Sequence, residues 1–205
     1  CQWACPAHTP VPEYIRLIAQ GRYDDAFMIN WKSNVFPGVL GRTCDRPCEP
    51  ACRRGRVEEE NQPKPEPVAI CRLKRVAADL KSDDVKARMP KKAAKKNGKR
   101  IACVGAGPAS LTVARDLAPL GYLVTVFDRD PRAGGMIWSQ IPRFRLPLEG
   151  IDEEVNYILD LGVAFKQRRI DSMKALMGEG YVAIFVGSGA SRGRDLQITC
   201  RKQAA

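Results

Sequence analysis

The stretch that decides the fold is residues 100–128, which read RIACVGAGPASLTVARDLAPLGYLVTVFD. An apolar strand leads into the glycine turn Gly105-Ala-Gly107-Pro108. A helix over 110–120 follows, and a second apolar strand over 123–127 ends at Asp128. This order of strand, glycine turn, helix and strand is typical of the first βαβ unit of a dinucleotide-binding domain. The alternative is a tight turn in a βαβ unit that binds nothing.

The residue types in the turn fit a pyrophosphate. A helix N-terminus presents unpaired amide groups and a partial positive charge. Gly105 permits the tight turn, and Gly107 lets a phosphate approach the backbone. Ser110 stands where glycine or alanine is usual at the helix–strand contact. Asp128 lies about 20 residues further on, where a carboxylate accepts the ribose hydroxyls.

The pattern continues downstream of this unit. Gly134-Gly135 indicates either a second close approach of backbone to ligand or a simple turn. A helix is predicted over 147–161, a short strand over 163–166 and a buried strand over 181–186. That last strand opens into Gly187-Ser-Gly189-Ala190.

Upstream, five cysteines fall into two motifs, Cys1-x3-Cys5-Pro6 and Cys44-x3-Cys48-x3-Cys52. Thiolates separated by three intervening residues lie on one side of a turn or short helix, which favours an iron–sulfur cubane. Zinc is the competing interpretation, but zinc sites favour two-residue gaps and often use histidine, and His8 is the only histidine. Eight cysteines without a recognisable secretion signal favour metal or redox use over disulfides. A chain that opens inside a motif without Met indicates further residues upstream.

The region around the cysteines is predicted to be helical. Short helices are expected over 12–21 and 23–31, a loop over 34–42 and a wrapping loop over 53–67. A helix over 67–80 places Ile70, Leu73, Ala77 and Leu80 on one face. Three further thiols have weaker signals: Cys71 is a ligand or a core residue, Cys103 is core, and Cys200 in the tail is uninformative.

Composition limits the class of protein. The formal charge is +11, and residues 86–100 hold eight basic and no acidic residues. We interpret this segment as a solvated linker. The alternative is a nucleic-acid site, but no aromatic residues interleave the lysines. No transmembrane segment or signal peptide is predicted, and a reducing, cytoplasmic location is expected.

Several motifs occur in one order and resemble a known family. They are the two cysteine motifs, Glu66-Pro-Val-Ala-Ile70, Gly105-Ala-Gly-Pro108, Gly134-Gly-Met136 and Ile141-Pro-x-Phe-Arg-Leu-Pro147. Together they resemble the small subunit of bacterial glutamate synthase and the N-terminal part of dihydropyrimidine dehydrogenase. Related flavin modules serve formate dehydrogenase or hydrogenase complexes. The resemblance covers residues 1 to about 198.

The resemblance implies an α-helical [4Fe-4S] domain over 1–85, a basic linker over 86–99, an incomplete Rossmann-like FAD domain over 100–198 and a tail over 199–205. One or two clusters are implied. Cys1 and Cys52 would serve one cluster, and Cys5, Cys44 and Cys48 the other. The fourth ligand of the second cluster would come from the helix after Pro-Val-x-Ile, where Cys71 is preferred to Lys74. The FAD site would comprise Gly105, Gly107, Pro108, Ala109, Ser110, Asp128, Gly134, Gly135, Met136 and Arg145.

The chain departs from the family at its end, because no second glycine-rich turn for a nicotinamide nucleotide follows Ile198. The expected function is that of an electron-transfer subunit or fragment, which passes electrons between FAD and clusters within a larger oxidoreductase complex. Its expected partners are other subunits of that complex and not nucleic acid. Oxidation of NAD(P)H by this chain alone is not expected, and no catalytic residue is predicted. The alternative is a structural or docking module that keeps the clusters and binds no flavin.

Overall fold

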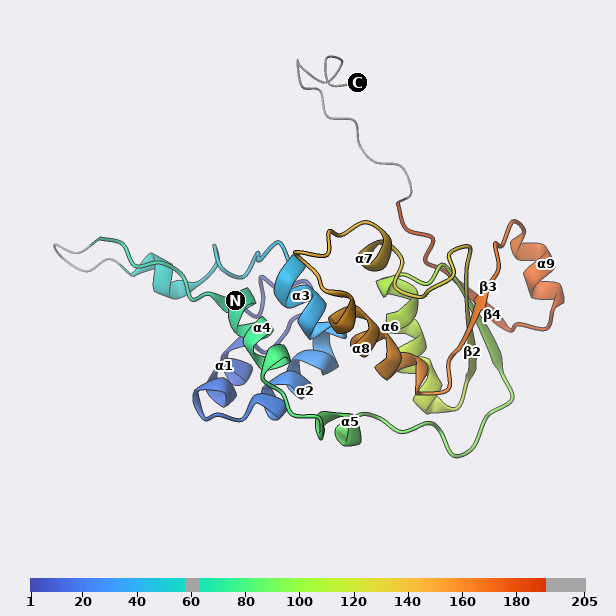
Figure 1. Ribbon diagram of the computed structural model, residues 1–205, viewed down its shortest axis with the longest axis horizontal. Coiled ribbons are helices and arrows are strands. Elements are labelled where there is room, and N and C mark those ends of the chain that lie inside the picture. Colours follow the sequence, from blue (N-terminus) through green and yellow to red (C-terminus); the bar gives the residue numbers. More distant parts are fainter. Residues whose placement is uncertain (58–62, 191–205) are drawn as a thin grey trace, which may run out of the picture.

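The structure is a computed structural model that describes residues 1–57 and 63–190. A helical part comes first and is followed by a parallel sheet with helices on both faces (Figure 1). The predicted class, an α-helical domain before a Rossmann-like α/β domain, is confirmed. Cys200 and the tail lie outside the described residues.

The helical part buries the apolar faces of three helices against one another. Tyr14, Leu17, Ala26, Ile70 and Ala77 form its core. Because the local sequence places apolar residues at helical spacing, the predicted helices are present. Its elements are α1 (Val11–Ala19), α2 (Tyr23–Asn34), α3 (Pro37–Thr43), the 3-10 turn η1 (Arg53–Arg56), α4 (Ile70–Asp79) and α5 (Val85–Arg88).

Helix α3 corrects the prediction of a loop over 34–42, which was wrong. Pro37 occupies the first helical turn, where the missing amide of proline costs no hydrogen bond. Gly41 lets α3 lie directly on α4. A Cβ atom at Gly41 would lie 2.8 Å from the Cα and N atoms of Arg75. Proline, one of the residues that indicated a loop, therefore begins a helix that packs closely on α4.

We expect Gly41→Ala to destabilise the protein by about 1–3 kcal/mol, because the new methyl group overpacks against backbone that cannot move aside. Urea unfolding followed by circular dichroism measures the change. Gly150→Ala is the matched control, since nothing lies within 4 Å of its Cβ position in a helix. The control should gain up to about 1 kcal/mol. Equal stabilities for the two variants would contradict the close α3–α4 contact.

The α/β part has a four-stranded parallel sheet in the order β3-β2-β1-β4. Alternate residues of β1 and β2 pack on opposite faces. One face is covered by α6 and α8, and the other by α9. The elements are β1 (Arg100–Val104), α6 (Pro108–Leu117), the 3-10 turn η2 (Ala118–Leu120), β2 (Leu123–Asp128), α7 (Met136–Ser139), α8 (Leu148–Leu159), β3 (Ala164–Gln167), α9 (Met173–Gly178) and β4 (Ala183–Val186).

Strand β4 is present as predicted but is not the buried strand that its sequence indicates. Val182 and Val186 are more than half exposed. Within the described residues, β4 pairs only with β1 and forms an edge of the sheet. An apolar run of strand length predicts a strand, but it does not reveal which neighbours the strand has.

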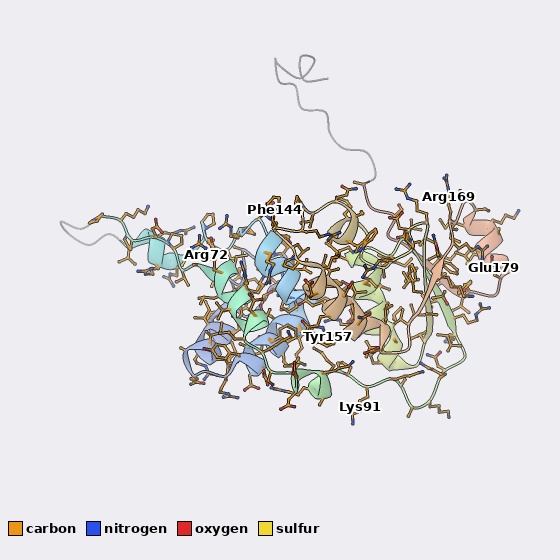
Figure 2. All side chains as sticks on the ribbon, in the orientation of Figure 1. Arg72, Lys91, Phe144, Tyr157, Arg169 and Glu179 are labelled. Carbon is orange, nitrogen blue, oxygen red and sulfur yellow. The ribbon has the colours of Figure 1, made fainter. Side chains whose placement is uncertain are left out.

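The two parts share a continuous core. Val35, Phe36 and Val39 of the helical part pack in the same cluster as the residues of α6 and α8 beneath the sheet. Tyr157 of α8 packs edge-on against Phe27 of α2, at the junction visible in Figure 2. The two parts are thus held as one folded unit.

The basic segment follows this junction. Lys86 forms an ion pair with Asp160 at 3.0 Å, and Arg88 pairs with Asp25. Residue 97 donates its backbone amide to the carbonyl of Gly121, which ties the segment to the α/β part. Two of the basic side chains of this segment are thus paired with carboxylates of the same chain.

Candidate functional site

The glycine turn connects β1 to α6 at the carboxyl edge of the sheet. Gly105 adopts a φ of +93°, and a Cβ there would collide with the carbonyl oxygen of Gly187. Gly107 is the N-cap of α6, and nothing lies within 4 Å of its Cβ position. Gly135, with a φ of +55°, would place a Cβ 2.8 Å from the Cα of Gly107. Glycine is required at Gly105 and Gly135 because their φ is positive. At Gly107 the absence of a side chain leaves the space beside the turn open.

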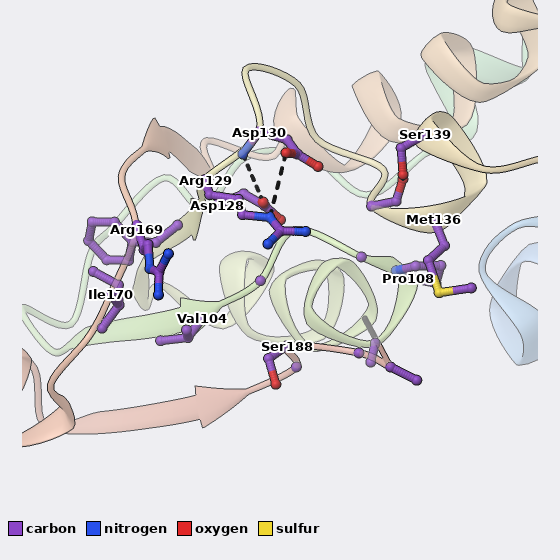
Figure 3. A pocket seen from close by; sticks show the side chains of 18 of the residues that line it. Val104, Pro108, Asp128, Arg129, Asp130, Met136, Ser139, Arg169, Ile170 and Ser188 are labelled. Atoms are coloured by element: carbon purple, nitrogen blue, oxygen red, sulfur yellow. Dashed lines mark hydrogen bonds and ion pairs between the residues drawn. The ribbon is translucent and has the colours of Figure 1, made fainter. Parts of the chain in front are cut away.

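A cavity of about 420 Å³ opens above this turn (Figure 3). It lies beyond the carboxyl ends of the strands, where doubly wound sheets bind nucleotides. Seven of the predicted cofactor residues line it: Gly105, Gly107, Pro108, Ala109, Asp128, Gly135 and Met136.

Asp128 ends β2 and faces the turn. Its Oδ2 accepts a hydrogen bond from the amide of Ala106 at 2.6 Å, and its Oδ1 accepts one from the amide of Asp130 at 3.0 Å. The carboxylate therefore fixes the shape of the glycine turn. Each oxygen keeps a further lone pair for a ribose hydroxyl.

Three predicted cofactor residues lie outside the cavity lining. The Ser110 side chain is fully buried, and its Oγ has no hydrogen-bond partner among the described residues. Gly134 donates its amide to the carbonyl of Ala106 and so supports the turn from behind. Arg145 points elsewhere: its Nε donates to the carbonyl of Arg42 at 3.2 Å.

Other lining residues escaped sequence reasoning. Arg168, Arg169 and Ile170 follow β3 and form one wall, while Arg129 and Asp130 follow β2. Glu179 accepts two hydrogen bonds from Arg168, at 2.9 and 2.6 Å, which fixes that guanidinium. The only sequence feature that could have indicated these residues is their place directly after a strand, because residues that follow parallel strands lie at the same edge of the sheet.

The cavity fits a dinucleotide on two observations. The space that a Cβ of Gly107 would enter is open, next to the first amides of a ten-residue helix. Those amides are the groups that bind pyrophosphate. The positive φ of Gly135 lets a second backbone segment close against the turn. The residues present therefore suit a phosphate held by main-chain amides.

The cysteines of the two motifs lie in the helical part of the molecule. Cys44 directly follows α3, and Cys48 is buried against Tyr14 and Ile70. Cys1 packs against the same core. Cys71 lies on the buried face of α4, where its thiol donates to the carbonyl oxygens of Leu40 and Gly41 at 3.3 and 3.4 Å. All the cysteines of the described residues are free thiols.

Burial, hydrogen bonds and nearby charges shift the pKa values of several of these thiols. Burial raises the pKa of Cys48, and Lys74 opposes that rise. Burial also raises the pKa of Cys71, with Cys44 adding to the rise and Lys74 again opposing it. Burial alone would raise the pKa of Cys5, but hydrogen bonds from Thr9 outweigh it and lower that pKa. Lys74, itself only 6% exposed, thus influences three of these thiols.

Cys52 belongs to a different neighbourhood. The Val68 amide lowers the pKa of Cys52, and the N-terminal amine of Cys1 contributes to the lowering. The Cys44 thiol thus acts on the pKa values of Cys48 and Cys71, and the Cys5 thiol acts on that of Cys48.

Within residues 1–57 and 63–190, no three Cys, His, Asp or Glu side chains are close enough to hold a single metal ion. The donor set nevertheless fits iron–sulfur chemistry, since it consists of free thiols in the helical part. The backbone placement of Cys44, Cys48 and Cys52 keeps three sulfurs on one short segment. The ligand assignments stay predictions.

Comparison with known proteins agrees with both halves of the site. Residues 1–86 match the family described as dihydropyrimidine dehydrogenase domain II, 4Fe-4S cluster. Residues 103–164 match the NAD(P)-binding Rossmann-like domain. The chain thus carries a 4Fe-4S domain of this family followed by a Rossmann-like domain, and its homologues include glutamate synthase small chains and related oxidoreductase subunits.

Three relatives illustrate the family. The chain is 36% identical to the NADP(+)-dependent formate dehydrogenase subunit beta of Moorella thermoacetica, over 92% of this chain and 29% of the relative. It is 32% identical to the glutamate synthase [NADPH] small chain of Mycobacterium tuberculosis, over 98% of this chain and 40% of the relative. It is 34% identical to the NADPH-Fe(3+) oxidoreductase subunit beta of Geobacter sulfurreducens, over 97% and 29%.

The chain thus spans less than half the length of these relatives. Of the helices that the structure describes, none has the length and apolar character needed to cross a membrane. The predicted order of a 4Fe-4S domain and a Rossmann-like nucleotide-binding domain is confirmed by the two domain matches.

Proposed function

We propose that this chain passes electrons between FAD and [4Fe-4S] clusters as part of a larger oxidoreductase complex. The observation that carries the proposal is that a thiol-rich helical part and a dinucleotide cavity are built on one shared core. The names of relatives as subunits of oxidoreductases support the place in a complex.

In this proposal the residues of the glycine turn bind the nucleotide, and the cysteines of the helical part bind the clusters. Gly107 and the first amides of α6 bind the pyrophosphate, and Asp128 orients the adenosine ribose. Pro108, Ala109 and Met136 shape the cavity and exclude water from it. Cys5, Cys44, Cys48 and Cys71 hold one cluster, and Cys1 and Cys52 contribute to another. FAD, when bound, supplies a carrier that exchanges two electrons on one side and single electrons on the other.

The proposal prefers FAD to a nicotinamide nucleotide in this cavity, which is a finer claim than the domain match makes. Anaerobically purified protein should contain about four iron and four sulfide per cluster and show a reducible visible band. Titration with FAD should saturate near one per chain, and NADPH should compete only weakly. Flavin fluorescence and an iron and sulfide assay measure these quantities.

Each outcome separates the alternatives. Clusters without flavin binding would favour the structural or docking module instead. Stoichiometric zinc without sulfide would contradict the iron–sulfur assignment. Tighter binding of NADPH than of FAD would assign the cavity to the nicotinamide nucleotide.

A further inference from the structure

Helix α3 is contacted at both ends by one segment of the α/β part, residues 145–154. The Glu154 side chain is 2% exposed, and it accepts hydrogen bonds from the amides of Gly38 at 2.6 Å and Val39 at 3.1 Å. At the other end of α3, the Nε of Arg145 donates to the carbonyl of Arg42 at 3.2 Å. These pairs are more than 100 residues apart in sequence.

Both contacts supply what α3 lacks locally. Its N-cap, Phe36, makes no side-chain capping bond, so the first amides need an acceptor from elsewhere. A guanidinium at the C-terminus also complements the helix dipole. Burial raises the pKa of Glu154 to about 8, while the two amides act in the opposite direction. Glutamate is retained in this apolar surrounding because the amides of α3 face it.

The contacted elements lead directly to the two candidate sites. Cys44 follows the last residue of α3, and the carbonyl oxygens of Leu40 and Gly41 accept from the thiol of Cys71. On the other side, Ile151 of α8 approaches the Cβ position of Gly134, which supports the glycine turn. Helix α3 therefore connects the segment of Cys44 to α8, which in turn packs against the glycine that supports the turn.

We propose that Glu154 and Arg145 are positioning residues that fix α3, and through it the Cys44 thiol, relative to the nucleotide cavity. Their role in electron transfer rests on the proposed function, because only bound cofactors make this spacing matter. Sites of this kind need their supporting residues to hold the geometry to within about 0.5 Å.

The test compares three variants in the full chain. Glu154→Gln keeps one of the two acceptors, Glu154→Met keeps the length and loses both, and Glu149→Gln on the exposed side of α8 is the control. Hydrogen exchange of the apo chain, read by mass spectrometry, should show about tenfold faster exchange over 38–48 in Glu154→Met. Glu154→Gln should be intermediate and Glu149→Gln unchanged. Peptides from α1 and β2 should be unchanged in all three.

A second readout uses the reconstituted chain. Extraction of iron by a chelator, and the line shape of the reduced cluster in EPR, should change in the same order, while FAD affinity stays within about twofold. If no cluster forms in the wild type, the proposed function fails. Hydrogen exchange still tests whether Glu154 and Arg145 hold α3 in place.

Three results would overturn the proposal. One is a Glu154→Met variant with wild-type exchange over 38–48, as a purely apolar packing role predicts. Another is faster exchange across the whole chain, which would show general destabilisation. If Glu154→Met does not fold, the exposed Arg145 provides the test. Arg145→Gln should speed hydrogen exchange at residues 42–48 only. The third result is unchanged exchange at 42–48 in that variant, which would also overturn the proposal.

Discussion

Cys48→Ser is expected to remove one cluster, with a loss of about four iron and four sulfide per chain and of the matching EPR signal. Cys48 is 7% exposed and packs against Tyr14 and Ile70, so its sulfur faces the interior. Burial raises the pKa of Cys48, Lys74 opposes that rise, and the thiols of Cys44 and Cys5 add to it. A serine hydroxyl is a hard, poorly ionised donor and does not replace a thiolate on iron.

The control for this loss is Cys103→Ala. Cys103 is fully buried in β1, where burial raises its pKa to about 11, and no predicted ligand lies beside it in the sheet. This variant should retain the iron and sulfide content of the wild type. Full iron and sulfide in Cys48→Ser, or equal losses in the two variants, would remove Cys48 from the ligand set.

The sequence predicted the nucleotide half well because its signals are local. Apolar strands, a glycine turn and a terminal acid at Asp128 are properties of short stretches, and β1, α6 and β2 appear where expected. The wall formed by Arg168, Arg169 and Ile170 has no such signal. It depends on β3 pairing beside β2, which is a tertiary property.

The helical half shows the opposite case. Pro37 and Gly38 indicate a loop when read alone, but α3 forms because Glu154, distant in sequence, accepts its first amides. The predicted face of α4 was also partly wrong. Leu80 is 55% exposed, while Cys71 and Lys74 are buried. The face is rotated because Gly41 lets α3 approach Arg75 closely, which periodicity alone does not reveal.

Gly107→Val is expected to weaken FAD binding by about 100-fold, which corresponds to ~2.7 kcal/mol. The position is suited to an unambiguous test. Gly107 has φ −78° and ψ 178°, values that any residue adopts, and nothing lies within 4 Å of its Cβ position. Valine therefore fits the fold without strain. Its methyl groups enter the space in which the amides of α6 would contact a phosphate.

The neighbouring glycines do not allow the same inference. A side chain at Gly105 or Gly135 would collide with backbone atoms, and the positive φ of both residues disfavours any residue but glycine. A loss of FAD binding in such a variant could therefore come from misfolding as well as from blocked access of the phosphate. Gly178→Val is the matched control, because its Cβ position is also open and it lies at the end of α9, outside the cavity lining.

Fluorescence titration gives the affinities, and a thermal melt shows whether each variant keeps the stability of the wild type. Unchanged FAD affinity in a folded Gly107→Val protein would mean that the phosphate does not approach this turn. Weaker binding in both variants would place the cause in the α/β part as a whole. Loss confined to Gly107→Val, with the cluster signal intact, would show that the nucleotide turn acts separately from the thiols at the far end of α3.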